Sequence, residues 1–439
     1  MTILGISILL IFFATTPNLG FFTIPSILTV TSVILILILN TSSLIKIKSF
    51  DIKSEKVLTI YLFFILLFYS AIYYGGLYQN KNSIVLGYFV LTGFILINFI
   101  RYHFFKKTFS FIFICTVYVL MSLWTIFNSP HPVVDTVVVL KEAPQMLIRG
   151  KNPYSSTFTQ VYPNVNPNYY NYLPFSFFYE LPFVLLFKDP RSVIVFSNLL
   201  SAILIYKLFK KTDKERVINV FVLTFLFLPR TFYMLEHAYL DPVIFSFFLL
   251  FIFFYVNKNK NKFAYLFLGL FLSFKQPPIL TIPLFLKENF FRKDFFKLKN
   301  FSLFLLPLIL PLIYLAINSK AFLEDIVFGL NPAKITSPIS SSLTLPTLLK
   351  YLSINANFAY LIGLILFAVT FIYLFFKKTS PLTKIVITFL AFNYFTYHAF
   401  FNSYFLVIQF LLLAITTEYF GQADKAHSKK SLQLFHLGS

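Results

Sequence analysis

Long apolar runs, separated by short basic or polar stretches, dominate the pattern along this chain. Twelve of the runs have roughly the length that a membrane-spanning helix needs. They cover residues 3–18, 21–39, 57–75, 83–100, 109–127, 192–209, 217–235, 239–256, 301–318, 353–376, 382–397 and 400–417. Two shorter runs, near 263–275 and 277–287, are separated by the break Lys275-Gln276-Pro277-Pro278. The pattern therefore predicts an all-α fold, a polytopic transmembrane helical bundle with about fourteen spans.

The composition agrees with a membrane protein. Hydrophobic residues make up 58% of the chain and charged residues 12%, and the mean hydropathy is +0.78. A soluble core cannot absorb that much apolar surface, whereas a bilayer requires it. The one cysteine, Cys115, falls inside an apolar run, so we expect neither a disulfide framework nor a thiolate metal site. The net charge of +21 does not indicate nucleic-acid binding, because the basic residues gather in short loops.

These basic loops predict how the chain is oriented. They are Lys46–Lys56, Arg101–Lys107, Lys207–Arg216, Lys258–Lys262, Lys287–Lys299, Lys377–Lys384 and the C-terminal tail. With a cytoplasmic N-terminus, all of them face the cytoplasm, as the positive-inside rule requires. This orientation holds only if residues 171–187 do not cross the membrane. Because that segment contains Pro174, Glu180 and Pro182, we expect it to lie in the membrane interface.

The polar and aromatic loops then collect on the extracytoplasmic face of the cytoplasmic membrane. They are a long first loop at 128–191, a turn at 236–241, the helix break at Lys275, a loop at 319–350 and a turn at 398–402. We expect the chemistry to take place on this face. The chain accordingly divides into N-terminal transmembrane helices at 1–127, the outer loop with in-plane helices at 128–191, a transmembrane core at 192–420 and a cytoplasmic tail at 421–439.

Asp135 is the first candidate for catalysis. It opens the first outer loop and is flanked by valines, which predicts a partly desolvated carboxylate that can act as a general base. Glu142 lies seven residues later, so on a helix both carboxylates share one face. Gly150 and the Asn152-Pro153-Tyr154 turn predict where this helix stops. A solvated loop acid and a simple helix cap are the plainer interpretations of these residues.

Further candidates occupy the other outer turns. Glu236 and Asp241 bracket a turn with a histidine between them and could help to hold a divalent cation such as Mg²⁺ or Mn²⁺, although the spacing matches no strong metal motif. Lys275, at the helix break, is placed to bind a phosphate. Arg230 is a second candidate for binding phosphate, and the alternative is that it forms an ion pair with Glu236. A lysine that reaches for the interface is the plainer interpretation of Lys275.

The last outer turn adds His398 and Asn402 as candidates for substrate binding, with an interfacial histidine as the plainer interpretation of the former. No motif for nucleotide binding or proteolysis occurs in a credible context.

Three features of the chain resemble the GT-C superfamily of integral-membrane glycosyltransferases, and within it the branch that uses polyprenyl-phosphate sugars (glycosyltransferase family 87 and its relatives). The first is an acid that opens the first large outer loop and is followed by an Ala, a Leu and a Gly-x-Asn-Pro-Tyr turn. This feature comprises Asp135, Ala143, Leu147, Gly150, Asn152, Pro153 and Tyr154. The second is the entry Tyr172-Leu173-Pro174-Phe175 to an in-plane helix, followed by two spans and an acidic turn. The third is the helix break within the sequence Gly269 to Pro283.

The resemblance implies a GT-C-like core and a role for particular residues. Asp135 would be the catalytic base, Glu236 or Asp241 the acid of the second loop, and Lys275 a residue near the lipid phosphate. The substrate-binding set would also include Glu142 and Tyr154. Five spans precede the outer loop here, whereas in the family this loop usually follows the first span.

We therefore expect a hexosyltransferase of GT-C type that moves a sugar, such as mannose, from a polyprenyl-phosphate-linked donor. The acceptor hydroxyl would belong to a glycan, a glycolipid or a protein of the cell envelope, and the displacement would invert the anomeric centre. A transporter or flippase of a lipid-linked saccharide is the alternative, because broken helices also suit transport. A membrane scaffold without enzymatic activity is a third interpretation.

Overall fold

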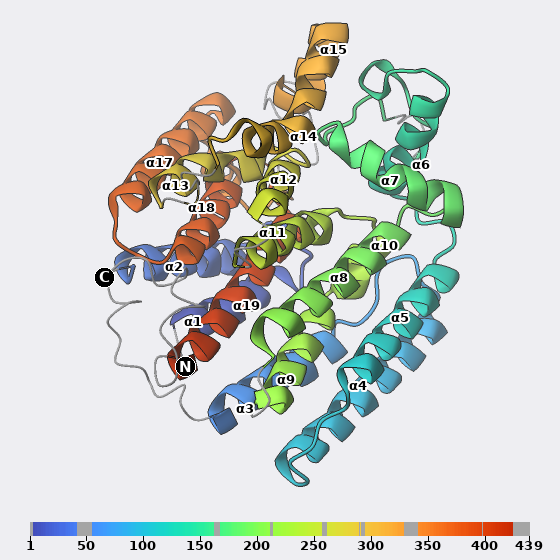
Figure 1. Ribbon diagram of the computed structural model, residues 1–439, viewed down its shortest axis with the longest axis vertical. Coiled ribbons are helices and arrows are strands. Elements are labelled where there is room, and N and C mark those ends of the chain that lie inside the picture. Colours follow the sequence, from blue (N-terminus) through green and yellow to red (C-terminus); the bar gives the residue numbers. More distant parts are fainter. Residues whose placement is uncertain are drawn as a thin grey trace. The chain divides into compact units, whose positions relative to one another are not determined.

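The computed structural model describes residues 3–41, 55–161, 167–210, 214–256, 261–288, 290, 295–328, 341–396 and 398–424. These residues are mainly helical and contain no β-strand, which confirms the predicted all-α class (Figure 1). The basic loops predicted at 46–56, 258–262 and 287–299, the outer loop at 319–350 and the tail from 421 onward lie partly or largely outside the described residues.

The chain folds into two units, each built from separate stretches of sequence. Unit 1 comprises Met1–Glu55, Gln276–Phe301 and Gly329–Ser439, and unit 2 comprises Lys56–Lys275 and Ser302–Phe328. The boundaries predicted from the sequence at 127, 191 and 420 stay predictions.

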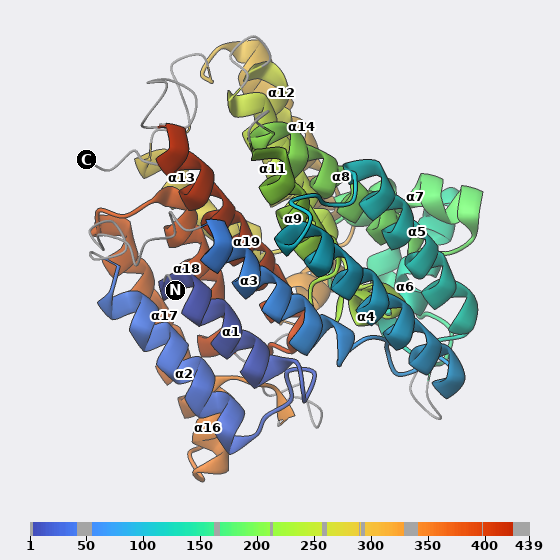
Figure 2. The same ribbon diagram turned by 90° about the horizontal axis from the view of Figure 1, so that it is seen from below.

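Unit 1 contains the first two helices and the C-terminal helices. They are α1 (Ile3–Thr15), α2 (Ile24–Leu39), the 3₁₀ turn η5 (Pro277–Thr281), α13 (Ile282–Lys287), α16 (Leu345–Tyr351), α17 (Ala356–Phe376), α18 (Pro381–Phe395) and α19 (Phe401–Asp424). Helix α18 packs against α17, α19 and α2, and α1 packs against α2 and α19 (Figure 2).

Local signals explain where the helices of unit 1 begin. The side chain of Ser380 accepts a hydrogen bond from the backbone N–H of Thr383, and Pro381 occupies the first turn of α18. Thr344 caps α16 in the same way. Almost every residue of α18 is buried, including Lys384, which forms an ion pair with Glu288. A buried lysine needs such a partner because an unpaired charge in an apolar interior is costly.

Unit 2 contains the longer set of helices. They are α3 (Glu55–Ile65), the π-helical turn η1 (Leu66–Ala71), α4 (Lys81–His103), α5 (Phe111–Asn128), α6 (Asp135–Ile148), the 3₁₀ turn η2 (Pro153–Ser155), α7 (Phe175–Phe187), α8 (Ser192–Phe209), α9 (Glu215–Leu226), α10 (Thr231–Glu236), α11 (Asp241–Val256), α12 (Asn261–Leu272), α14 (Leu298–Ile317, from residue 302 onward), α15 (Ser319–Leu323) and the π-helical turn η6 (Glu324–Phe328).

The centre of unit 2 lies where α11 packs against α8 and α12, and where α9 packs against α5 and α8. Every residue of α9 from 217 to 226 is buried. The predicted in-plane segments form α6 and α7, which pack against each other (Figure 1). Gly150 has φ +67° and Asn152 caps η2, so the predicted stop of the first in-plane helix is confirmed.

The predicted span at 217–235 is not one continuous helix, and this prediction was wrong. Helix α9 ends at Leu226, and α10 begins only at Thr231. Pro229 cannot donate a backbone hydrogen bond, and Arg230 adopts the left-handed conformation with φ +65°. Together these two residues interrupt the helix.

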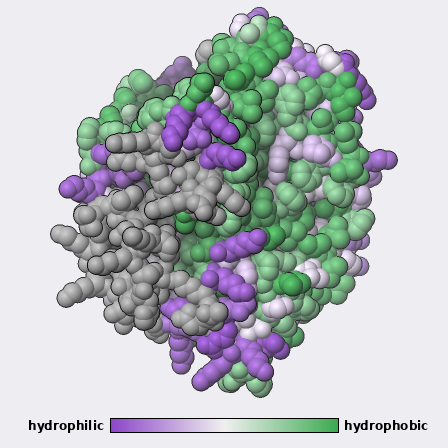
Figure 3. All heavy atoms as spheres, viewed as in Figure 1, coloured by the Kyte–Doolittle hydropathy of each residue, from purple (hydrophilic) through white to green (hydrophobic). Residues whose placement is uncertain are grey.

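Among the residues that the structure describes, six helices are long and apolar enough to cross a membrane, namely α4, α5, α8, α14, α17 and α19. Several shorter apolar helices accompany them, so the total of about fourteen spans stays a prediction. On the face shown in Figure 3, much of the described surface is apolar, and the polar residues lie in patches. On α4, for example, Phe89 is 64% exposed, as expected of a helix that faces lipid.

Candidate active site

Asp135 is the first residue of α6 and is half-buried. Its Oδ1 accepts a hydrogen bond from the backbone N–H of Thr136 at 2.8 Å, and the hydroxyl of Tyr169 donates to its Oδ2. The N-terminus of a helix carries a partial positive charge that stabilises a carboxylate. Asp135 therefore lies at the start of α6, with one carboxyl oxygen hydrogen-bonded to the helix backbone and the other to a tyrosine.

Two hydrogen bonds join the start of α6 to distant parts of the chain. The hydroxyl of Thr136 donates to the backbone carbonyl of His237 at 2.5 Å. The hydroxyl of Tyr78 donates to the carbonyl of Val133 at 2.7 Å. The segment 128–191, the turn at 236–241 and the loop that precedes α4 thus meet around Asp135.

Glu236, at the end of α10, is fully buried and holds the loop that precedes α4. Its carboxylate accepts hydrogen bonds from the backbone N–H groups of Leu77, at 2.5 Å, and Tyr78, at 3.0 Å. Burial raises the pKa of Glu236, and these backbone hydrogen bonds act in the opposite direction. Glu236 therefore has a structural function as the anchor of this loop.

His237 follows Glu236 and is also buried. Its Nδ1 lies 3.0 Å from the carbonyl of Tyr233 and 3.5 Å from Oε2 of Glu236. Burial and, less strongly, the positive charge of Arg230 lower the pKa of His237 to about 4, against the opposing effect of the hydrogen bond to Tyr233, so the ring is neutral near pH 7. With the proton on Nδ1 directed at Tyr233, Nε2 is left as a hydrogen-bond acceptor.

The helix break and the second acidic turn meet through an ion pair. Nζ of Lys275 lies 3.3 Å from Oδ1 of Asp241, the first residue of α11. Asp241 is 2% exposed, whereas 18% of the Lys275 side chain is accessible. The backbone N–H of Leu173 donates to the carbonyl of Phe274, which also attaches the first outer loop to the break. Lys275 thus presents its charge beside the loop that carries Asp135.

Tyr172 lies among these charged groups. Its ring centre is 5.9 Å from Nζ of Lys275. Burial raises the pKa of the Tyr172 hydroxyl well above its usual value, and the negative charges of Asp241 and Asp135 are among the groups that raise it further. We call Asp135, Tyr169, Tyr172, Asp241 and Lys275 the acid–tyrosine cluster. It combines a carboxylate that can accept a proton with a cation that can bind an anionic group.

The remaining predicted site residues of unit 2 make structural contacts. Glu142 accepts a hydrogen bond from the backbone N–H of Thr159 at 3.0 Å. Tyr154 is 2% exposed, and its hydroxyl donates to the carbonyl of Tyr172 at 2.8 Å. The guanidinium of Arg230 lies 5.1 Å from the ring centre of Tyr73. Substrate binding by these residues stays a prediction.

His398 and Asn402 belong to unit 1. His398 is exposed and packs edge-on against Phe400, and Asn402, in the first turn of α19, is half-buried. Their predicted participation in substrate binding is untested by these contacts.

The described residues contain no group of three or more His, Cys, Asp or Glu side chains arranged to hold a metal ion. The role of Glu236 and Asp241 as metal ligands stays a prediction.

Sequence reasoning missed Tyr169 and Asp325. The backbone N–H of Tyr170 donates to Oδ2 of Asp325 at 2.8 Å, which fixes the chain next to Tyr169. Burial raises the pKa of Asp325 to about 7. The run Asn168-Tyr169-Tyr170-Asn171-Tyr172 was a usable signal for the tyrosines, because polar aromatic residues in a loop favour binding. Nothing in the sequence near Asp325 distinguishes it from an ordinary loop acid.

The fold and the cluster define a helical protein with several apolar helices of membrane-spanning length and a partly buried acid–tyrosine site. No protein-family model matches the chain, and no curated protein matches it. The likeness to GT-C glycosyltransferases therefore rests on the three sequence features described above.

Proposed function

We propose that the protein is a membrane glycosyltransferase of GT-C type. It moves a hexose, such as mannose, from a polyprenyl-phosphate-linked donor to an acceptor hydroxyl on the extracytoplasmic side of the cytoplasmic membrane. The observation that carries this proposal is the convergence at Tyr172 of Asp135 and of the Lys275–Asp241 pair. Base and cation come from segments about 140 residues apart in the chain.

In the proposed reaction, Asp135 accepts the proton of the acceptor hydroxyl while the acceptor oxygen attacks C1 of the sugar. The bond between C1 and the phosphate oxygen breaks, and polyprenyl phosphate leaves with the electron pair. A single displacement of this kind inverts the anomeric centre. The half-buried position of Asp135 supports this role, because a general base needs access to the proton it removes.

Lys275 is proposed to hold the donor phosphate. Its ammonium group is paired with Asp241. The donor phosphate would therefore have to displace this carboxylate from the ammonium group or share the ammonium group with it. Because Asp241 is buried and Lys275 is partly accessible, the ammonium group is the member of the pair that a ligand can reach. A divalent cation, Mg²⁺ or Mn²⁺, belongs to the same proposal: Asp241 would help to hold it, and it would neutralise negative charge on the leaving phosphate.

The deciding experiment uses the purified full-length protein with a radiolabelled polyprenyl-phosphate hexose and measures release of polyprenyl phosphate. Asp135→Asn preserves size and should lower the rate by roughly 10²- to 10⁴-fold, the usual contribution of a positioned base. Glu142→Gln is the matched control: it lies on the same helix, about 10 Å further along from the rise of 1.5 Å per residue. It should lower the rate clearly less than Asp135→Asn does.

Near-normal transfer by Asp135→Asn would refute the proposed mechanism. If the wild-type protein moves the labelled lipid across a vesicle membrane without releasing polyprenyl phosphate, the transporter or flippase interpretation is correct instead.

A further inference from the structure

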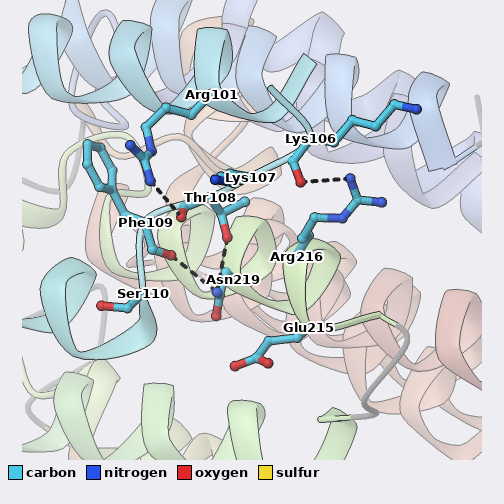
Figure 4. Close-up of a pocket in the computed structure, with 9 residues that line it drawn as sticks. All are labelled: Arg101, Lys106, Lys107, Thr108, Phe109, Ser110, Glu215, Arg216 and Asn219. Carbon is cyan, nitrogen blue, oxygen red and sulfur yellow. Dashed lines mark hydrogen bonds between the residues drawn. The ribbon is translucent and has the colours of Figure 1, made fainter. Parts of the chain in front are cut away.

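A hollow of about 480 Å³ lies at the end of unit 2 where α4 is joined to α5. The turn between these two helices forms one wall, and the first residues of α9 form the other. Its lining consists of Arg101, Lys106, Lys107, Thr108, Phe109, Ser110, Glu215, Arg216 and Asn219 (Figure 4). Two of the basic loops predicted from the sequence, 101–107 and 207–216, therefore contribute to one site.

The charge of the hollow favours an anion. Four of its side chains are basic, and Glu215 is the one acidic side chain in its lining. Glu215 is already engaged, because the hydroxyl of Tyr206 donates to its Oε1 at 2.5 Å and Nζ of Lys210 lies 3.7 Å from the same oxygen. The positive charges of the lining therefore exceed the negative ones.

The backbone around the hollow is held by its own polar residues. Arg101 donates to the carbonyl of Thr108 at 3.4 Å, and Arg216 donates to the carbonyl of Lys106 at 3.1 Å. Figure 4 shows these two arginines on either side of the turn. The amide nitrogen of Asn219 donates to Oγ1 of Thr108 and to the carbonyl of Phe109, each at 3.2 Å. These hydrogen bonds hold the turn between α4 and α5 against the start of α9, so the shape of the hollow does not depend on a ligand.

Two buried polar atoms in the lining, Oδ1 of Asn219 and Nε of Arg101, lack a hydrogen-bond partner within the described part of the chain. Asn219 is 4% exposed, and its Oδ1 accepts no hydrogen bond there. A buried acceptor without a donor is costly, which favours a ligand that supplies a hydroxyl or amine proton next to its anionic group.

The surroundings of the hollow are those of a lipid. Phe104 and Phe105, which directly precede the two lysines, are 75% and 66% exposed, and Ile112 on α5 is 75% exposed. A soluble anion would make no contact with these apolar side chains. The acyl chains of a lipid bound by its headgroup would lie along them. In the space-filling view, polar residues gather at the lower end of the molecule, where Figure 1 places the turn between α4 and α5.

We propose that this hollow binds the phosphate headgroup of an anionic phospholipid from the leaflet on the side that the basic loops predict to be cytoplasmic. Basic pockets between membrane helices on this side are suited to such headgroups. Helix α5 separates the hollow from the acid–tyrosine cluster, since it begins at the hollow and ends seven residues before Asp135. Its 18 residues span about 27 Å, close to the thickness of the hydrocarbon core.

The test measures lipid binding by the purified full-length protein in detergent, with native mass spectrometry as the readout and no sugar transfer involved. Phosphatidylglycerol is the anionic probe, and it also offers headgroup hydroxyls; phosphatidylcholine is the zwitterionic comparison. The double variant Lys106→Gln/Lys107→Gln removes two exposed lysines of the hollow. It should weaken phosphatidylglycerol binding by roughly 10- to 30-fold and leave phosphatidylcholine binding unchanged.

A matched control is available in unit 1. Lys377 and Lys378 also follow the end of a long apolar helix, α17, and their double glutamine variant removes the same charge. It should retain the preference for phosphatidylglycerol. An equal loss in both double variants, or no preference for the anionic lipid in the wild type, would overturn the proposal. Complete displacement of the lipid by soluble glycerol 3-phosphate at the same concentration would assign the hollow to a soluble anion and also overturn it.

Discussion

The contact between Gly76 and Glu236 provides a sharp test of the structure around Asp135. A Cβ atom added to Gly76 would lie 1.6 Å from Oε2 and 2.1 Å from Cδ of Glu236. Gly76 does not have a positive φ, so alanine meets no backbone strain there and the clash alone determines the effect. Because the carboxylate is completely buried, it cannot rotate into solvent, and either it or the loop must move.

The cost follows from the hydrogen bonds that this movement breaks. Glu236 accepts one hydrogen bond from Leu77 and one from Tyr78. A hydrogen bond to a charged group contributes about 1.5–3 kcal/mol, so losing both costs about 3–6 kcal/mol of the free energy of unfolding. For a domain of roughly 150–250 residues, a loss of 1 kcal/mol lowers the midpoint of thermal unfolding by about 2–4 °C. The lower limits of both ranges give a fall of about 6 °C for Gly76→Ala.

The assay is thermal unfolding of purified Gly76→Ala in detergent, with Gly93→Ala as the control. A Cβ atom at Gly93, in the middle of α4, meets no heavy atom within 4 Å. Since alanine favours a helix over glycine by about 1 kcal/mol, Gly93→Ala should be neutral or slightly stabilising. In a Glu236→Ala background, Gly76→Ala should cost far less than in the wild type, because the clashing group is gone. If Gly76→Ala is as stable as Gly93→Ala, Glu236 does not anchor the loop at Leu77 and Tyr78.

Two further predictions concern the donor and the topology. Lys275→Ala should raise the apparent KM for the lipid donor more than it lowers kcat, because the phosphate is charged in both the ground and the transition state; Lys275→Arg, which keeps the charge opposite Asp241, should restore much of the loss. An unchanged KM in Lys275→Ala would remove this lysine from the donor site. Cysteines introduced at Gln160 and Ile335 should react with impermeant reagents from outside, whereas one at Asn259 should not; positions 259 and 335 lie outside the described residues. Labelling at 259 would show that residues 171–187 cross the membrane.

The positions of the helices could be predicted from the sequence because the signals for them are local. Apolar runs of sufficient length, capping residues such as Thr344 and Ser380, and the Gly150 stop act within a few residues of the elements they define. The interruption at Pro229 and Arg230 had a local signal too, and the length of the apolar run concealed it.

The partners of the polar side chains were decided by tertiary structure. Thr136 reaches the carbonyl of His237, and Lys275 reaches Asp241, across separations of 101 and 34 residues. The basic hollow arises because the turn after α4 meets the start of α9. Apolar helices of this kind present similar surfaces to many neighbours, so hydropathy does not specify which of them pack together. Only the packed arrangement determines which carboxylate meets which cation.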